Sequence, residues 1–424
     1  MNSQARLWFL AITLSSLVLP PTVAAKRPAD IEPRLEPCKL ISDQAIHNAP
    51  RLAKPPYLTP VTDPVFATQI TRITGDPGTQ VANIPGGIWG SVARHHYSKD
   101  QAWNADESLI FLDRNEAGGR GAPLFLDGET YRPLFSRRPP GGGEVRWHSS
   151  DPSLMVFAAE NTLGTWNVRT GSMTPLAKFD GYEDLKIGPY EGNLSADGHL
   201  IVLTGRNRRG APVMLVYDLK NGSSRAEIAL STVTKTLDWA SISASGKFIV
   251  VNDDDDRTFI LDYDGVVVSR FKEYGRPSHY DLALDASGED IAVGVSKSPP
   301  DEGLVIARRL RDGASVVLTE AGFASHSSTR NIRRSGRGFS DFETTKTVRP
   351  YNGEIITYSL ARGVVYRVAH HRNVVGDYLS ETHASPSPTG DRVIFASDWG
   401  AREGRPVQAY VADFRGLCRG QLRP

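Results

Sequence analysis

The chain has 424 residues, and its 49 Lys and Arg against 48 Asp and Glu give a formal net charge of +1. This balance argues against a general binder of nucleic acid or of membrane surfaces, because a polyphosphate surface requires a basic footprint. Two cysteines are too few for a zinc-finger or disulfide-scaffold fold. With 39 Gly and 28 Pro in a chain that is 40% hydrophobic, the composition favours a globular protein of many turns and short strands.

Residues 1–25 have the pattern of a secretory signal peptide. Arg6 supplies the positive charge, residues 7–19 form an apolar run of 13, and residues 23–25 (Val-Ala-Ala) offer a small-residue cleavage site. A bilayer span needs about 20 apolar residues, so neither this run nor any later one predicts a membrane-spanning helix. We therefore expect a protein exported to the periplasm or beyond it, not inserted into a membrane, and monomeric.

The two cysteines, Cys38 and Cys418, lie near opposite ends of the mature chain. In an oxidising compartment a disulfide that ties the termini together is favoured over two unpaired buried thiols. We expect an N-terminal extension over residues 26–65, followed by one domain over residues 66–424.

A short turn followed by an apolar run recurs along this domain. The turns begin at Asp106, Asp151, Asp197, Ser245, Ser287, Ser335 and Thr389. Their intervals of 45, 46, 48, 42, 48 and 54 residues suit a four-stranded propeller blade, whose repeat is about 40–50 residues. Asx-Gly pairs such as Asn221-Gly222 and Asp264-Gly265 follow the next apolar run and predict hairpins. The pattern predicts an all-β fold, a seven-bladed β-propeller closed by an N-terminal strand at 66–73 that joins a last blade at 383–414.

The innermost strand of a propeller blade leads from the functional rim to the turn, so residues six to nine before each turn should surround one opening. These positions hold Tyr190, Trp239, His279, Tyr280, His326 and His383. His95 and His96 precede the first turn by 11 and 10 residues, and His148 precedes the second by 3, which would set it deeper. Such histidines either perform chemistry or are hydrogen-bonded lining of a wet channel, and the sequence leaves both interpretations open.

Tyr190 lies eight residues before Gly198, and Arg206 lies eight residues after it. A hairpin would set these two side chains opposite each other, about 5 Å apart at Cβ. A Tyr–Arg pair beside histidines suits β-elimination from a uronic-acid polymer, in which Arg neutralises the carboxylate and a neutral His or Tyr removes the C5 proton. Further arginines on neighbouring loops either attract an anionic chain or form solvated surface. They are Arg137, Arg138, Arg208, Arg209, Arg330, Arg333, Arg334 and Arg337.

Two groups of residues are candidate metal ligands. His279, His326 and His383 would come from three adjacent blades, and three imidazoles suit Zn²⁺ or Mn²⁺, although none has the spacing of a tight H-x-x-x-H motif. The four aspartates at 253–256 either hold Ca²⁺ or are merely solvated, and they would repel a polyanion locally.

The histidine-bearing segments are the most specific part of the sequence. They are residues 95–106, 278–281, 326–331 and 383–399. These segments resemble the seven-bladed propeller polysaccharide lyases, namely the oligogalacturonate lyases and the ulvan lyases. The general propeller similarity covers most of the mature chain and is shared with TolB-like propellers, which catalyse nothing.

The resemblance implies cleavage of a uronate-containing polysaccharide, ulvan-like or pectate-like, by β-elimination. It implies His96 or His148 as base, Tyr190 as acid or base and Arg206 as carboxylate neutraliser. Residues expected to bind substrate are His95, Trp239, Tyr280, Arg208 and Arg330.

This chain also departs from the family pattern. In the Gln-x-x-His-x-His metal motif of the oligogalacturonate lyases, His383 would be the first histidine, but this chain has Ser380 in place of the glutamine and Ser385 in place of the second histidine. Thr329 stands where ulvan lyases have a zinc-binding cysteine. The alternative is a TolB-like periplasmic propeller that binds a glycan or protein partner without catalysis. A glycoside hydrolase is disfavoured, because it requires two facing carboxylates.

Overall fold

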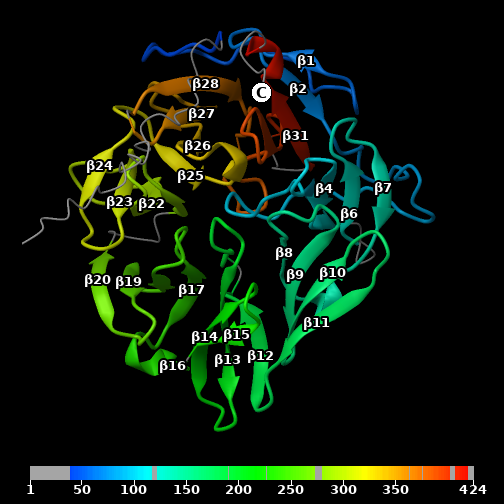
Figure 1. Ribbon diagram of the computed structural model, residues 1–424. Coiled ribbons are helices and arrows are strands. Elements are labelled where there is room, and N and C mark those ends of the chain that lie inside the picture. The colour runs from blue at the N-terminus through cyan, green and yellow to red at the C-terminus, as the bar shows by residue number, and fades with distance from the viewer. Residues whose placement is uncertain are drawn as a thin grey trace, which may run out of the picture.

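The computed structural model describes residues 39–116, 122–189, 191–225, 227–272, 279–361, 363–374, 376–401 and 406–418. Regular structure within these ranges consists of β-strands and single-turn 3-10 helices. The expected signal at 1–25, Cys38 and Tyr190 lie outside the described residues. No helix within them is long and apolar enough to cross a membrane. The sheets stand around a central opening, as the blades of a β-propeller do (Figure 1).

Five antiparallel sheets follow the sequence repeat in chain order. The first contains β8 (Val145–Trp147), β9 (Leu154–Ala159), β10 (Thr162–Asn167) and β11 (Met173–Lys178). The second contains β12 (Tyr182–Ile187), β13 (Leu200–Asn207), β14 (Pro212–Asp218), β15 (Ser223–Ser224) and β16 (Ile228–Ala229). The third contains β17 (Leu237–Ile242), β18 (Ile249–Asp253), β19 (Arg257–Leu261) and β20 (Val267–Lys272). The fourth contains β21 (Asp281–Leu284), β22 (Asp290–Val295), β23 (Val305–Arg309) and β24 (Ser315–Val317). The fifth contains β25 (Ala324–Ser328), β26 (Arg337–Phe342), β27 (Glu354–Ser359) and β28 (Val365–His370).

The sixth sheet combines strands from both ends of the described chain. It contains β1 (Val61–Thr62), β2 (Gln69–Arg72), β3 (Val92–Arg94), β5 (Arg114–Glu116), β29 (Ser385–Pro386), β30 (Arg392–Ser397) and β31 (Val407–Asp413). A smaller sheet has three strands, β4 (Leu109–Leu112), β6 (Leu124–Asp127) and β7 (Pro133–Ser136). The 3-10 helices are η2 (Pro140–Gly142), η3 (Leu230–Thr232), η4 (Ile332–Arg334) and η5 (Arg415–Leu417).

Within the described ranges, six sheets therefore have the four or more strands of a blade, and the prediction of seven blades was wrong. The reason lies in the first repeat. The segment assigned to its innermost strand makes only an isolated bridge between Trp103 and Ile110. β5 pairs with β3 of the sixth sheet instead of joining β4. The first repeat is thus left as the three-stranded sheet, although its apolar run forms β4 as expected.

The two ends of the described chain lie side by side in the sixth sheet. β2, from the segment predicted to be a strand at 66–73, pairs antiparallel with β31, and Gln69 stands opposite Asp413. The backbone N–H of Lys39 donates to the carbonyl of Leu417 at 3.0 Å. Closure of the ring by the N-terminal strand stays a prediction, and so does the disulfide between Cys38 and Cys418.

The apolar run after each turn forms a strand, and these strands build the core between blades. In one such cluster, Val156 and Leu163 of the first sheet pack with Ile201 and Leu215 of the second. Because the blades bury their faces against one another, the ends of their innermost strands are held at fixed positions around the opening. Those positions carry the candidate site.

Arg367 fixes the segment at 39–53 to the ring. Its side chain is fully buried with that of Glu354, and Nη1 donates to both carboxylate oxygens at 2.7 and 2.8 Å. Nη2 also donates to the carbonyl oxygens of Asp43 and Ala45, at 3.0 and 2.7 Å. One buried guanidinium therefore joins β27 and β28 to the N-terminal segment.

We expect Arg367→Met to lower the free energy of unfolding by about 3–5 kcal/mol, because Glu354 is then buried without its counter-charge. Urea denaturation followed by tryptophan fluorescence measures this loss. The double variant that also carries Glu354→Leu should recover most of it. A loss below about 1 kcal/mol in the single variant, the range of exposed ion pairs, would contradict the anchoring role.

Candidate active site and metal centre

Three of the expected rim histidines meet at one mouth of the ring. His326 lies in β25, and His279 and His383 each precede an innermost strand by two residues. The rings of His279 and His326 stack with centroids 4.5 Å apart, and those of His326 and His383 are 4.2 Å apart. The ring of Tyr97 contacts His383 at 4.5 Å. The structure thus brings together three histidines that are 47 and 57 positions apart in the chain.

Two of these histidines have a strained backbone. His279 and His383 have φ angles of +45° and +44°, in the left-handed region that non-glycine residues rarely occupy. Such a conformation costs on the order of 1–3 kcal/mol and persists only where the surroundings enforce it. At His279 the ring Nδ1 donates to the carbonyl of Ser325 at 3.0 Å. Strain at two neighbouring histidines is typical of a functional site.

His326 and His383 form a metal-type ligand set with Glu381. One ligand atom from each of the three lies within 4.8 Å of the others. Nε2 of His326 is buried without a hydrogen bond and lies 3.6 Å from Oε2 of Glu381, while Nδ1 of the same ring lies 3.0 Å from Oγ of Ser325 and 3.4 Å from Oδ1 of Asp341. A carboxylate behind one ring nitrogen fixes the tautomer and leaves the other nitrogen free to bind a cation. The donor set of two imidazoles and a carboxylate suits Mn²⁺ or Zn²⁺.

His383 fits this set with one condition. Its Nδ1 accepts a hydrogen bond from Arg94, so the neutral ring keeps its proton on Nε2, which donates to Glu381 at 3.0 Å. Coordination of a cation by Nε2 therefore requires the Arg94 contact to shift. Burial, and then the Arg94 guanidinium, lower the pKa of His383 well below its ordinary value. Burial, and then His326, do the same to the pKa of His279, so both rings are neutral near pH 7.

The sequence pattern does not single out Glu381. The first residue of the Gln-x-x-His-x-His motif falls on Ser380, one position earlier. The available signal was the Glu-x-His spacing, because residues two apart lie on the same side of an extended segment. The aspartates at 253–256 do not form a second metal-type set among the described residues. Asp253 instead accepts from Nε of Arg257 at 2.9 Å.

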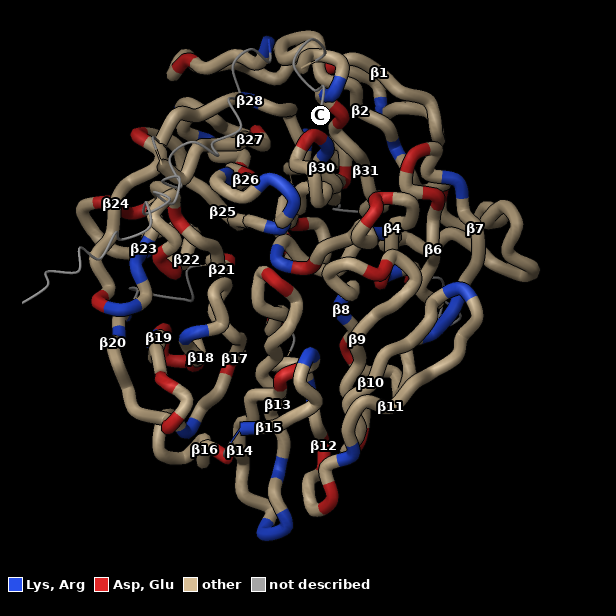
Figure 2. The backbone as a smooth tube through the Cα atoms, in the orientation of Figure 1, with Lys and Arg blue, Asp and Glu red and all other residues tan. Residues whose placement is uncertain are grey.

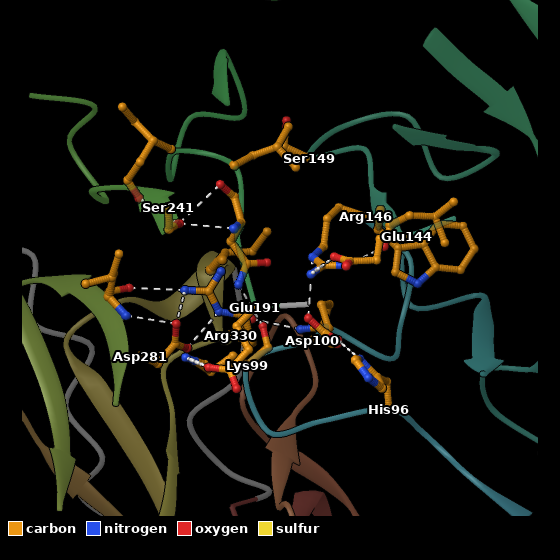
Figure 3. Close-up of a pocket in the computed structure, with 18 of the residues that line it drawn as sticks. His96, Lys99, Asp100, Glu144, Arg146, Ser149, Glu191, Ser241, Asp281 and Arg330 are labelled. Carbon is orange, nitrogen blue, oxygen red and sulfur yellow. Dashed lines mark hydrogen bonds and ion pairs between the residues drawn. The ribbon is translucent and has the colours of Figure 1, made fainter. Parts of the chain in front are cut away.

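A cavity of about 660 Å³ adjoins this histidine cluster and is lined by innermost strands and turns of several sheets. His95 connects the two regions, because it lines the cavity and its Nε2 donates to the carbonyl of His383 at 2.6 Å. Burial, followed by Arg94, lowers the pKa of His95 to about 3, so the ring is a neutral structural donor. Figure 3 shows the charged residues that line the cavity near the cluster.

His96 is the residue best placed to act as a base in this cavity. Its Nδ1 donates to Asp100, whose other oxygen lies 3.4 Å from Nε of Arg146 (Figure 3). Nε2 of His96 makes no hydrogen bond within the described part of the chain, and the side chain is 21% exposed. Burial would raise the pKa of Asp100, but Arg146 and His96 hold it at about 2. Burial also opposes charging of His96, yet the Asp100 carboxylate raises the pKa of His96 above 6.5.

His148 lines the same cavity but is oriented differently. Its Nδ1 accepts from the backbone N–H groups of Ser150 and Asp151 at 3.3 and 3.0 Å. The neutral ring therefore carries its proton on Nε2 and presents a donor. Of the two candidate bases, the tautomers favour His96.

Trp239 and Tyr280, expected to bind substrate, instead surround a lysine. Both side chains are buried, and Nζ of Lys99 lies 3.8 Å from the Trp239 ring centroid and 5.6 Å from that of Tyr280. Lys99 also forms an ion pair with Glu191. Glu191 is positioned by close backbone packing, since Gly188 has φ +42° and a Cβ there would lie 1.7 Å from the carbonyl oxygen of Ala240. Lys99, Asp100 and Glu191 were all missed in the sequence.

Three cations that line the cavity are paired with carboxylates. Arg330 lines the cavity, and its Nε and Nη2 donate to the two carboxylate oxygens of Asp281 at 2.8 and 2.7 Å. Lys99 and Arg146 are likewise paired with acidic residues, and acidic as well as basic segments surround the central opening (Figure 2). This part of the cavity therefore does not present the basic field that the arginine-rich loops led us to expect.

Arg206 and Arg208 are exposed and are not among the residues that line the cavity. The strand register places Glu183 opposite Arg206, whose Nη1 donates to the carbonyl of Gly210 at 3.0 Å. The hairpin prediction that set Tyr190 opposite Arg206 is thus contradicted by the register, because the inner strand β12 ends before residue 190. Tyr190 itself lies outside the described residues.

No protein-family model and no curated protein matches this chain. Solved structures do match. One described as an oligogalacturonate lyase in complex with manganese has a TM-score of 0.58 and 15% identity, over 84% of this chain and 95% of that one. An oligogalacturonate lyase from Vibrio parahaemolyticus has a TM-score of 0.55 and 14% identity, over 84% of this chain and 96% of that one. At these identities the similarity shows the β-propeller fold, and that fold includes a protein with bound manganese.

We expect His326→Ala and Glu381→Gln each to weaken Mn²⁺ binding at least about 10-fold, because the first removes a donor of the set and the second removes its negative charge. Isothermal titration calorimetry of protein first treated with a chelator measures this directly. His199→Ala, an exposed histidine in a turn, is the matched control and should bind as the parent does. Equal affinity in the parent and both cluster variants would place the cation elsewhere.

Proposed function

We propose that this protein is an exported polysaccharide lyase that cleaves a uronate-containing anionic polysaccharide by β-elimination. The observation that carries the proposal is His96. Its Nδ1 is held by Asp100, and its Nε2 is free on a cavity that adjoins a metal-type ligand set. A base with a free lone pair beside a carboxylate-binding centre is the arrangement that elimination from a uronate requires.

His96 removes the C5 proton in this proposal. The proton sits next to the uronate carboxylate, and it becomes acidic when the negative charge that develops there is stabilised. His96 takes the proton on Nε2, and Asp100 stabilises the imidazolium that results. The electrons of the C5–H bond form the C4–C5 double bond, and the bond from C4 to the glycosidic oxygen breaks with its electrons on that oxygen. The oxygen takes up a proton from the His96 imidazolium, which returns the base to its neutral form.

The carboxylate of the substrate needs a positive partner, and Arg206 does not lie where it would supply one. Arg330, Lys99 and Arg146 each face an acidic residue already. A divalent cation held by His326, Glu381 and His383 would neutralise the uronate carboxylate. The similarity to a manganese-containing oligogalacturonate lyase structure supports this assignment.

The substrate class, the location and the monomeric state belong to the same proposal. Uronate polymers are too large to enter a cell, so a lyase for them is useful outside the cytoplasm, in agreement with the signal pattern at 1–25. Ulvan-like and pectate-like chains are both candidate substrates.

A substrate panel tests the reaction itself. We expect a rise in absorbance near 235 nm, from the unsaturated uronate that elimination produces, on at least one of ulvan, polygalacturonate, glucuronan, alginate and glycosaminoglycans in the presence of Mn²⁺. Chelation of the cation should abolish the rise, and added Mn²⁺ should restore it. Folded, metal-loaded protein that gives no rise on any of these polymers would favour a binding propeller without catalysis.

On the active polymer, His96→Ala should lower kcat by about 10²–10⁴-fold, the usual contribution of a general base. His148→Ala should change kcat only a few-fold, because that ring presents a donor. Circular dichroism and thermal unfolding of both variants check that the fold is intact. The reverse order of the two effects would assign the base to His148.

The pH dependence follows from the His96–Asp100 pair. Since the pKa of His96 is raised above 6.5 and the base must be neutral, kcat/KM should rise as the pH increases through that raised pKa. Asp100→Asn removes the negative charge, so the inflection should move to lower pH. Asp151→Asn, in the turn at His148, should leave it in place. The ion pair also contributes folding stability that is present below pH 6.5 and lost as the pH rises through the folded pKa.

A further inference from the structure

The far end of the cavity has a different character from the mouth. Residues from the turns that end the innermost strands line it, namely Ala105, Ser149, Ala196, Ala244, Leu284 and Pro388. These six side chains are small or apolar. Each of these turns belongs to a different repeat, so this end is a ring of hairpin turns around the same central channel.

Arg337 is a cation that lines this end of the cavity without a partner. It begins β26, next to the turn at Ser335-Gly336, and its side chain is 7% exposed. It makes no hydrogen bond or ion pair with any residue in the described ranges, in contrast to Arg330, which is bound by Asp281 through two hydrogen bonds. Its guanidinium nitrogens make no hydrogen bond in the described part of the chain, yet none of them is fully buried. Because Arg337 also lines the cavity, solvent in the channel reaches the guanidinium.

The surroundings of Arg337 offset its charge only in part. Burial, and then the like charge of Arg334, lower the pKa of Arg337 to about 9, against the smaller opposite effects of Tyr366 and the Asp391 carboxylate. The Asp391 carboxyl acts on Arg337 through space and accepts from the Thr389 hydroxyl at 2.9 Å, and no ion pair joins it to Arg337 within the described residues. Leu360 lines the same cavity, and its backbone N–H donates to the carbonyl of Gly336, the residue before Arg337, at 2.9 Å. An uncompensated guanidinium in such surroundings is costly for the folded protein unless an anion binds to it.

Arg337 is also well separated from the histidine cluster. Asp341, which faces His326, lies four residues further along the same strand, and this spacing corresponds to about 13 Å. A ligand at Arg337 is therefore not a ligand of the metal-type set. It occupies the opposite end of one channel.

We propose that Arg337 forms an anion site at the far end of the channel and binds a carboxylate. A guanidinium presents parallel N–H donors that match the two oxygens of a carboxylate. The Arg337 guanidinium carries a single positive charge, so a monovalent anion pairs with it one to one, whereas a divalent phosphate brings a second negative charge that Arg337 does not match. The carboxylate comes either from a small organic acid or from a remote uronate of a bound chain. The site does not depend on the reaction proposed above.

Arg337→Met tests this site in the full-length protein without any assay of activity. Acetate, monomeric galacturonate, a galacturonate oligomer and phosphate are titrated by calorimetry, and thermal unfolding is measured with and without each. Acetate and galacturonate should bind the parent and stabilise it, and binding should be about 10- to 100-fold weaker in Arg337→Met, the usual loss for a hydrogen bond to a charged group. Without ligand, Arg337→Met should be at least as stable as the parent, because an unpaired buried charge has been removed.

Arg333→Met is the matched control, since Arg333 lies in the same loop, is exposed and does not line the cavity. It should bind as the parent does. Arg337→Lys, which keeps the charge but loses the paired donors, should bind carboxylates more weakly than the parent. If the oligomer alone binds through Arg337, the carboxylate is that of a uronate chain; if acetate binds as well, a small acid suffices. Equal carboxylate affinity in the parent, Arg337→Met and Arg337→Lys, or tighter binding of phosphate than of carboxylates, would overturn the proposal.

Discussion

The Asp100 carboxylate is the contact on which the proposed chemistry depends. It stands between His96 and Arg146, so it fixes the imidazole tautomer on one side and is itself kept ionised on the other. Neither His96 nor Arg146 alone would define a base, because an imidazole with a free choice of tautomer presents its lone pair only part of the time. The pair places that lone pair on Nε2, on the wall of the cavity.

The same principle separates the other histidines. His148 accepts through Nδ1 and therefore presents a proton, whereas Nε2 of His95 donates to the carbonyl of His383. His326 has Asp341 behind Nδ1, and its Nε2 makes no hydrogen bond and faces Glu381 at 3.6 Å. His148 is thus a donor, His95 a structural link and His326 a candidate metal ligand. What the other ring nitrogen contacts decides the role of each histidine.

The sequence was a good guide to features that repeat along the chain. The turn spacing predicted the apolar strands, the β-propeller fold and the rim positions of His279, His326 and His383, because these follow from local periodicity. The seventh blade failed because β5 pairs with β3, and no local pattern shows which distant strand a segment will choose. In the same way Arg206 was placed by hairpin symmetry, but β12 ends early and Glu183 takes the opposite position.

The residues missed in the sequence share one property. Lys99, Asp100, Glu191 and Glu381 become important through contacts with residues far away in the chain or through a side that only the folded segment defines. A buried lysine over the Trp239 ring, paired with Glu191, has no signature in composition or spacing. Their charges also pair with the cations of the cavity, so the cavity presents paired ions and not a basic field. In our proposal an added cation is therefore needed to bind a polyanion there.

The most direct test of this account is the nitrogen-15 spectrum of the histidine side chains, recorded against pH and assigned to His96 by comparison with His96→Gln. We expect a neutral His96 with its proton on Nδ1 and a pKa above that of free imidazole, since Asp100 faces that nitrogen. A proton on Nε2, or a pKa below the ordinary value, would contradict the central claim.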